Sequence, residues 1–327
     1  MKKQPQRNLT QRDLAQRDLA KSQKQWFTLL WQVQGSVIPC ILPRVLLCMG
    51  FALVVWILYE RGLPVSLPLV SGIVPSIVLG LLLVFRTNTA YERFWEGRKL
   101  WGTMVNTTRN LARQIWVTVE ENSLQDRKDK EQALQLIVGF AIATKLHLRK
   151  RKDLTELQPL LTEAQCSQLQ SMNSPPLEIA FWLGDYLQVQ HLRNTIHPYQ
   201  QRAMVELLDL MVDVLGGCER ILKTPIPLAY SIHLKQLLLI YCLTLPLQIV
   251  SDVGGWCILV AGLVAFAVFG IEAIGIEIEN PFGCDPNDLP LDDICQTMYR
   301  NAKDLMTLTP SVEADRVRYQ REQEGSV

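Results

Sequence analysis

Charge is absent from long stretches of this 327-residue chain. Residues 63–85 and 253–271 contain no Asp, Glu, Lys or Arg, and Arg44 is the only charged residue between Ile38 and Tyr59. About 18 nearly uncharged apolar residues is the length that a helix needs to cross a bilayer. This argues against a purely soluble protein. With a further apolar stretch near residue 240, the sequence predicts four membrane spans at about 38–59, 65–85, 230–250 and 255–276.

The sequence also has few of the residue patterns that enzymes and metal sites require. Its four histidines are not spaced with acids or cysteines, it has no glycine-rich phosphate loop, and its eight cysteines form no CxxC pair. The sequence has no stripe of basic residues interleaved with aromatic residues, which a groove that binds single-stranded nucleic acid requires. We therefore predict no enzyme activity, no required cofactor and no nucleic-acid partner.

The distribution of basic residues predicts the topology. The first 24 residues hold seven Lys or Arg against two Asp, and they lack the apolar core of a secretory signal. Residues 86–113 contain six Lys or Arg residues and only two acidic residues, Glu92 and Glu96. Because Lys and Arg near a span favour the cytoplasmic side, we expect an integral, multi-pass membrane protein with both termini in the cytoplasm.

The long segment between the second and third spans is amphipathic with helical spacing, as in Leu134, Ile137, Val138 and Ala141. Ser174–Pro176 and His197–Pro198 mark loops between helices, whereas Gly216-Gly217 is expected to weaken a helix. The chain is therefore predicted to be all-α. Its predicted divisions are a cytoplasmic N-terminal segment 1–37, a membrane pair 38–85, a cytoplasmic helical domain 86–227, a second membrane pair 228–276 and a cytoplasmic acidic segment and tail 277–327.

The second predicted span contains two prolines and two glycines, at Pro68, Gly72, Pro75 and Gly80. Such residues bend helices, and in a membrane they are tolerated where neighbours or water satisfy the freed backbone groups. We therefore expect a bent helix that lines a water-filled pathway. A helix that only anchors a scaffold protein has no need of these residues.

Three segments carry a family resemblance. Residues 85–102 (FRTNTAYERFWEGRKLWG), 216–230 (GGCERILKTPIPLAY) and 277–291 (EIENPFGCDPNDLPL) resemble motifs of the bestrophin family in its bacterial and plastid branch. The resemblance extends over about residues 26–309, in order and with the four-span layout. It implies a homopentameric ion channel in a bilayer, here the bacterial inner or plasma membrane.

The resemblance also implies a narrow apolar neck formed by the second membrane helix. Counting back from the Phe-Arg pair places the neck at Ile77, Leu81 and Phe85, which share one helical face. Rings of apolar side chains gate ions by dewetting. The same stripe could instead pack against a neighbouring helix, and a different helix register would bring Val70, Val74 and Val78 to the path.

A second constriction in the cytoplasmic domain is implied by the same family. Counting back from Gly216-Gly217 places it at Tyr199, with Ile196 one helical turn earlier as the alternative. A small aliphatic residue is frequent there in the family. Tyr199 would narrow the path and add a hydroxyl group.

Eight acids and no base lie between Asp252 and Asp293. Taken alone, these carboxylates are expected to cap helices and to pair with the bases of 86–113. The family's vertebrate branch uses the corresponding segment as a calcium clasp, which implies Ca²⁺ ligands at Glu277, Asn280, Asp285 and Asp288. Pro286 and Asn287 interrupt the acidic run, so calcium control is the weaker of these two expectations.

The sequence is compatible with two kinds of permeant ion, cations and anions. The acids of 252–293 could concentrate cations such as sodium or potassium, and the bases after Phe85 could concentrate chloride or bicarbonate. Phe85 offers positive ring edges to an anion. Likeness to the plastid branch favours monovalent anions. A cation channel, and more remotely a membrane-anchored scaffold, are the alternatives, whereas no inverted repeat supports a transporter.

Overall fold

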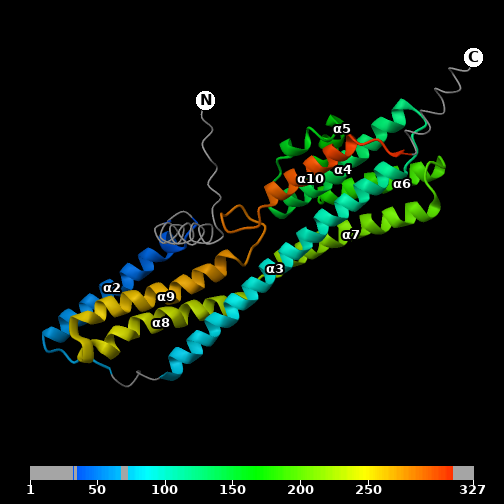
Figure 1. Cartoon of the computed structure of the whole chain (residues 1–327). Coiled ribbons are helices and arrows are strands. Elements are labelled where there is room, and N and C mark those ends of the chain that lie inside the picture. Colours follow the sequence, from blue (N-terminus) through cyan, green and yellow to red (C-terminus); the bar gives the residue numbers. More distant parts are fainter. Residues whose placement is uncertain (1–31, 33–34, 68–72, 312–327) are drawn as a thin grey trace, which may run out of the picture. The chain divides into compact units, whose positions relative to one another are not determined.

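A computed structural model describes residue 32, residues 35–67 and residues 73–311 of the chain (Figure 1). Within these residues the fold is all-α, as predicted, and contains no strand. Two 3₁₀ turns lie at Thr155–Leu157 and Gly254–Trp256. The helices are α2 (Ile38–Glu60), α3 (Ile73–Thr118), α4 (Leu124–Leu148), α5 (Glu163–Ser171), α6 (Pro175–Leu192), α7 (Pro198–Lys223), α8 (Leu228–Val253), α9 (Cys257–Glu277) and α10 (Leu291–Met306).

The chain forms two compact units. The apolar unit comprises Met1–Leu79 and Gln236–Ile274, and the polar unit comprises Gly80–Lys235 and Gly275–Val327. The boundaries predicted from the sequence, at 85/86, 227/228 and 276/277, were placed at the ends of apolar runs. The compact units divide instead within α3, α8 and α9, each of which continues without a break from one unit into the other.

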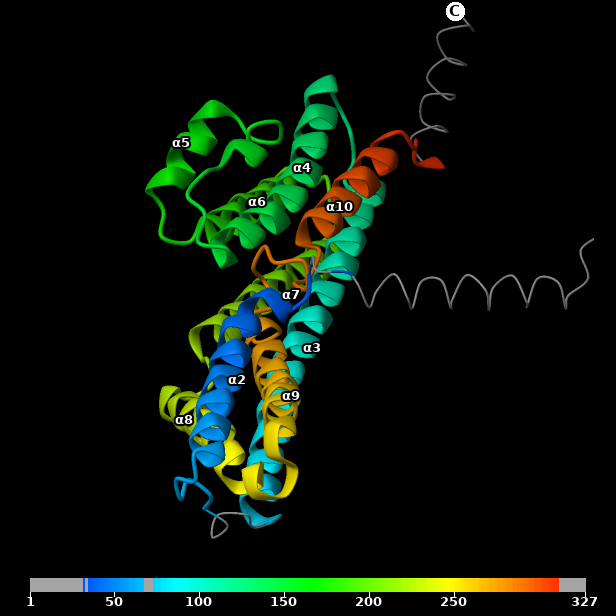
Figure 2. The same ribbon diagram turned by 90° about the vertical axis from the view of Figure 1, so that its left-hand side faces the viewer.

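The apolar unit packs α2 beside α8 and α9 (Figure 1, Figure 2). Val55, Val250 and Cys257 form a small buried cluster of this unit. A Cβ added at Gly262 of α9 would lie 2.8 Å from the Met49 sulfur of α2, so these two helices depend on a glycine for their close approach. Arg44 of α2 and Glu272 of α9 form an ion pair at 3.2 Å.

Two described segments are long and apolar enough to cross a membrane, Ile38–Glu60 and Leu228–Glu277. The second contains α8 and α9 joined by the turn at Gly254–Trp256. Within the predicted span at 65–85, the structure describes residues 65–67 and the part of α3 from Ile73 to Phe85. At 1.5 Å per residue this part of α3 covers roughly 20 Å of a hydrocarbon core that is about 30 Å thick.

Some sequence predictions fall outside the described residues. They include nearly all of the N-terminal segment 1–37 and the alternative neck residue Val70, while the side chain of Val74 is likewise not described.

The polar unit is built around α4. Every residue from Leu136 to Leu146 is buried, because α6, α7 and α10 pack against different sides of the helix. A helix that is apolar on all sides is typical of the centre of a domain. The core extends to α3 through Trp101, Met104 and Trp116.

Proline and polar side chains set the helix starts in this unit. The prolines at 175 and 198 are the first residues of α6 and α7, where the missing N–H is no loss. The predicted loops are therefore confirmed at Ser174 and His197, which precede α6 and α7, whereas Pro175, Pro176 and Pro198 belong to the helices. Gly216-Gly217, which the sequence predicts to weaken a helix, lies inside the continuous helix α7. A Cβ at Gly217 would lie 2.9 Å from Leu100, so the glycine admits that side chain of α3.

Two charged side chains of the polar unit, Lys145 and Asp126, are buried and pair with more exposed side chains. Lys145 Nζ lies 2.7 Å from Asp292 Oδ1 and also pairs with Glu156. Burial lowers the pKa of Lys145, but the hydrogen bonds to these two carboxylates outweigh it and raise the pKa overall. Buried pairs of this kind tolerate the loss of one partner poorly.

Asp126 is the buried acid at the start of α4. Its carboxylate accepts hydrogen bonds from Arg193 at 2.5 Å and from the Asn122 N–H at 3.0 Å, and its own N–H donates to Ser123 at 3.2 Å. Desolvation raises the pKa of Asp126, but these hydrogen bonds outweigh it, so the pKa lies below its ordinary value. The stabilisation is present at neutral pH and is lost as the pH falls through the folded-state pKa.

We expect Asp126→Asn to lower the free energy of unfolding by about 2 kcal/mol, because charge-assisted hydrogen bonds contribute about 1.5–3 kcal/mol. Thermal unfolding of the detergent-solubilised chain at a fixed scan rate measures the shift. Asp129→Asn makes the same change three residues later, where the carboxylate accepts only an exposed bond from Gln125. Equal midpoints for the two variants would contradict this role of Asp126.

Candidate ion path

The predicted neck residues lie on one face of α3. Ile77, Leu81 and Phe85 are 54%, 52% and 61% exposed, whereas Leu79 and Leu83 of the same helix are buried. The spacing of four residues keeps the three exposed side chains on one side of the helix. Val78, from the alternative stripe, is also exposed. An exposed apolar face of this kind requires cover by lipid or protein, or lines a path.

Arg86 follows this apolar face and points into the protein. Only 3% of the residue is exposed. Its guanidinium donates from Nη2 to Glu279 Oε2 at 2.8 Å and from Nη1 to Ser231 at 2.8 Å. The charge nearest to the predicted neck is therefore neutralised by a carboxylate of the segment that follows α9.

Glu279 joins a third segment to this pair. Its other carboxylate oxygen accepts from the N–H of Ile226 at 3.1 Å, and its carbonyl accepts from Arg93 Nε at 3.1 Å. Arg93 also donates to the carbonyls of Thr224 and Ile221 at the end of α7. We call Arg86, Arg93 and Glu279 the Arg-Glu clamp. It ties α3 to the end of α7 and to the segment after α9.

All parts of the clamp lie in the three segments that carry the family resemblance. The prediction that acids after the fourth span pair with bases of 86–113 is confirmed for Glu279. It is wrong for Glu272, whose partner is Arg44 of α2. Neither the role of Ser231 nor that of the Thr224 carbonyl was predicted, because backbone and hydroxyl acceptors leave no pattern in a sequence.

The two predicted aperture residues differ in exposure. Tyr199 is 81% exposed in the first turn of α7, and its ring stacks on His197 at 5.2 Å between centroids. Ile196 is 5% exposed and belongs to the core of the polar unit. Only Tyr199 therefore has a side chain available to line a path.

The four predicted calcium ligands lie at the end of α9 and in the following loop. Asp288 closes this loop, because its carboxylate accepts from the Asp285 N–H at 2.7 Å and its own N–H donates to the Asp285 carbonyl at 3.0 Å. Desolvation raises the pKa of Asp288, and the nearby acids Asp285 and Glu277 add to the rise. Asn280 accepts from the Phe282 N–H at 3.5 Å. Across residues 35–67 and 73–311, no group of three His, Cys, Asp or Glu side chains is arranged to hold a metal ion.

Comparisons with known proteins agree with this architecture. A family described as "Bacterial/Fungal Bestrophin protein" matches residues 18–304. A "Voltage-dependent anion channel-forming protein" of a Nostoc species is 59% identical over 293 residues, which cover 90% of this chain and 95% of that protein. A protein of the same description from a Synechocystis species is 59% identical over 290 residues, covering 89% and 94%.

A solved structure is also similar. The crystal structure of a bacterial bestrophin homologue from Klebsiella pneumoniae has a TM-score of 0.76 and 28% identity, and the match covers 83% of this chain and all of that one. The matched proteins are described as channel-forming proteins and not as enzymes, in agreement with the sequence prediction.

We expect Glu279→Gln to destabilise the protein by about 3–5 kcal/mol, because it leaves Arg86 charged, buried and without its carboxylate. The thermal unfolding midpoint of the whole solubilised chain measures the loss. The double variant Arg86→Met/Glu279→Gln removes the uncompensated charge and is expected to recover part of it. If the double variant is destabilised by as much as the single variants Arg86→Met and Glu279→Gln together, or by more, coupling through this ion pair is contradicted.

Proposed function

This chain belongs to the bacterial and fungal bestrophin family, and on that premise we propose that it forms a homopentameric channel for monovalent anions in the bacterial inner membrane. The observation that carries the proposal is the exposed apolar face of α3 at Ile77, Leu81 and Phe85, followed at once by a buried and neutralised Arg86.

The exposed apolar face of α3 has the composition that a hydrophobic neck requires. In a ring of five copies, the three side chains would form three apolar rings one helical turn apart along a central path. Narrow apolar rings make it costly for ions to keep their hydration water, so they limit conduction without fixed charge. Tyr199, exposed at the start of α7, is our candidate for the second constriction.

The pairing of the acids supports anions over cations. The sequence has eight acids between Asp252 and Asp293, which favoured a cation reading. In the structure, Glu272, Glu279 and Asp292 all pair with basic side chains. Three of the negative charges are therefore balanced locally and add little to a long-range potential.

Unpaired bases on α3 add to this argument. Arg98, Arg109 and Arg113 are exposed and make no ion pair with any described residue. An excess of positive charge along the helix that carries the neck would raise the local concentration of chloride or bicarbonate. The relatives whose descriptions name anion channels point in the same direction.

Current across a planar bilayer containing the purified protein tests the ion selectivity. Under a tenfold KCl gradient, we expect a reversal potential near the chloride equilibrium value, about 59 mV from zero. A value near that of potassium would establish the alternative, a cation channel.

Repeating the recording from calcium-free solution to millimolar calcium tests the calcium clasp, which predicts a change in open probability. No current from verified pentamers would favour the scaffold.

Replacement of Leu81 by alanine tests the neck. We expect Leu81→Ala to increase single-channel conductance, because a smaller side chain widens the ring and makes it easier to wet. Leu263→Ala is the matched control, since Leu263 is an exposed leucine of α9 outside the proposed path. Conductance that changes equally in both variants, or in neither, would remove Leu81 from the path.

A further inference from the structure

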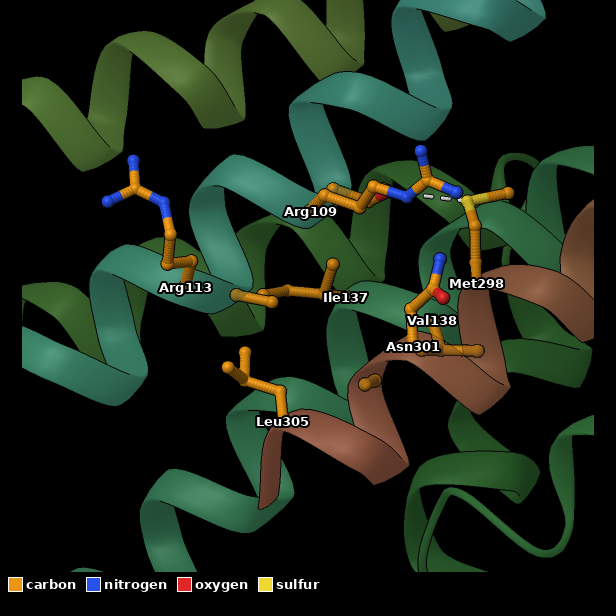
Figure 3. Close-up of a pocket in the computed structure, with 10 residues that line it drawn as sticks. Arg109, Arg113, Ile137, Val138, Met298, Asn301 and Leu305 are labelled. Atoms are coloured by element: carbon orange, nitrogen blue, oxygen red, sulfur yellow. Dashed lines mark hydrogen bonds between the residues drawn. The ribbon is translucent and has the colours of Figure 1, made fainter. Parts of the chain in front are cut away.

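A pocket of about 280 Å³ lies within the polar unit, between α3, α4 and α10 (Figure 3). Its walls are mainly apolar. It is lined from α3 by Ala112, from α4 by Ile137 and Val138, and from α10 by Ala302 and Leu305. The volume and the lining are those of a small-molecule site rather than of a water channel.

Polar groups gather at one side of this pocket, and they are donors. Arg109 of α3 makes no ion pair or hydrogen bond with any described residue. Figure 3 shows its side chain extending toward Met298 and Asn301 of α10, while Arg113 points the other way. The Asn301 amide nitrogen is buried and has no hydrogen-bond partner among the residues that the structure describes.

These donors have no anionic partner among the residues that line the pocket. The ten lining residues include no Asp or Glu. The Thr108 hydroxyl already contacts the Val105 carbonyl at 3.0 Å and the Met298 sulfur at 3.2 Å. An unpartnered buried amide costs about 1–3 kcal/mol, and a ligand that supplied an acceptor would remove that cost.

We propose that this pocket binds a small organic acid. The carboxylate lies between the Arg109 guanidinium and the Asn301 amide, and the apolar part of the molecule fills the space over Ile137, Val138 and Ala302. An inorganic ion would leave the apolar walls unfilled, and a neutral apolar molecule would leave the buried Asn301 amide nitrogen without an acceptor. None of the residues that line the pocket belongs to the predicted neck or to the Arg-Glu clamp.

Binding of hexanoate to the whole protein in lipid nanodiscs tests the proposal. Isothermal titration, with empty nanodiscs as the blank, is expected to show saturable binding. Arg109→Gln should weaken it roughly 10- to 100-fold, the fold-change that corresponds to a charge-assisted hydrogen bond of about 1.5–3 kcal/mol. Arg98→Gln, an exposed arginine of the same helix outside the pocket, should leave the affinity unchanged.

Two further measurements examine the apolar half of the site. Ala302→Leu should fill the pocket and abolish hexanoate binding while the thermal unfolding midpoint stays within a few degrees. Hexanamide and acetate, which lack the charge and the chain respectively, should each bind at least tenfold more weakly than hexanoate. The proposal is wrong if either binds as tightly, if Arg109→Gln equals Arg98→Gln, or if the assembled protein shows no saturable binding.

Discussion

The ion pair between Arg86 and Glu279 is the interaction on which the arrangement of α3 depends. Arg86 directly follows the exposed apolar face, and it would be a costly residue to bury without a carboxylate. Glu279 comes from the segment after α9 and also accepts from the backbone of Ile226 between α7 and α8. The pair therefore joins three segments that are distant in sequence. It fixes α3 at the point where its surface changes from apolar to charged.

The clamp also explains how an apolar path can lie close to charged groups. An unpaired arginine at position 86 would place a fixed positive charge beside the proposed neck and would hold water there. Because Arg86 faces inward and is neutralised, the exposed side chains at Ile77, Leu81 and Phe85 are all apolar. In the proposed channel, charge selection would then be left to the unpaired bases further along α3, which would attract anions without holding them in the narrowest part.

Helix positions were largely predictable from the sequence, because the spacing of apolar residues and the prolines at 175 and 198 act locally. Family membership was predictable as well, since residues 85–102 and 277–291 form long and specific patterns. The pairing of these segments was predicted only in part. Arg86 and Glu279 are far apart in the chain, and the same reasoning that paired them assigned the wrong partner to Glu272.

Other features have no signal in a single sequence. Lys145 and Asp126 are charged residues on the helix α4, where a sequence pattern places charged residues at the surface, yet both are buried because packing supplies partners from elsewhere. The organic-acid pocket was missed for a related reason. Arg109 contributed to the count of bases after the second span, while the approach of its side chain to Asn301 of α10 depends on the tertiary fold.

The central claim is that the exposed apolar face of α3 faces the ion path, and thiol modification at position 81 tests it most directly. In Leu81→Cys channels recorded in a planar bilayer, a charged, water-soluble methanethiosulfonate reagent is expected to reduce the current. The unsubstituted protein, with its native cysteines, and Leu263→Cys should be unaffected. Current that persists in Leu81→Cys after modification, at the level of the two controls, would contradict the account.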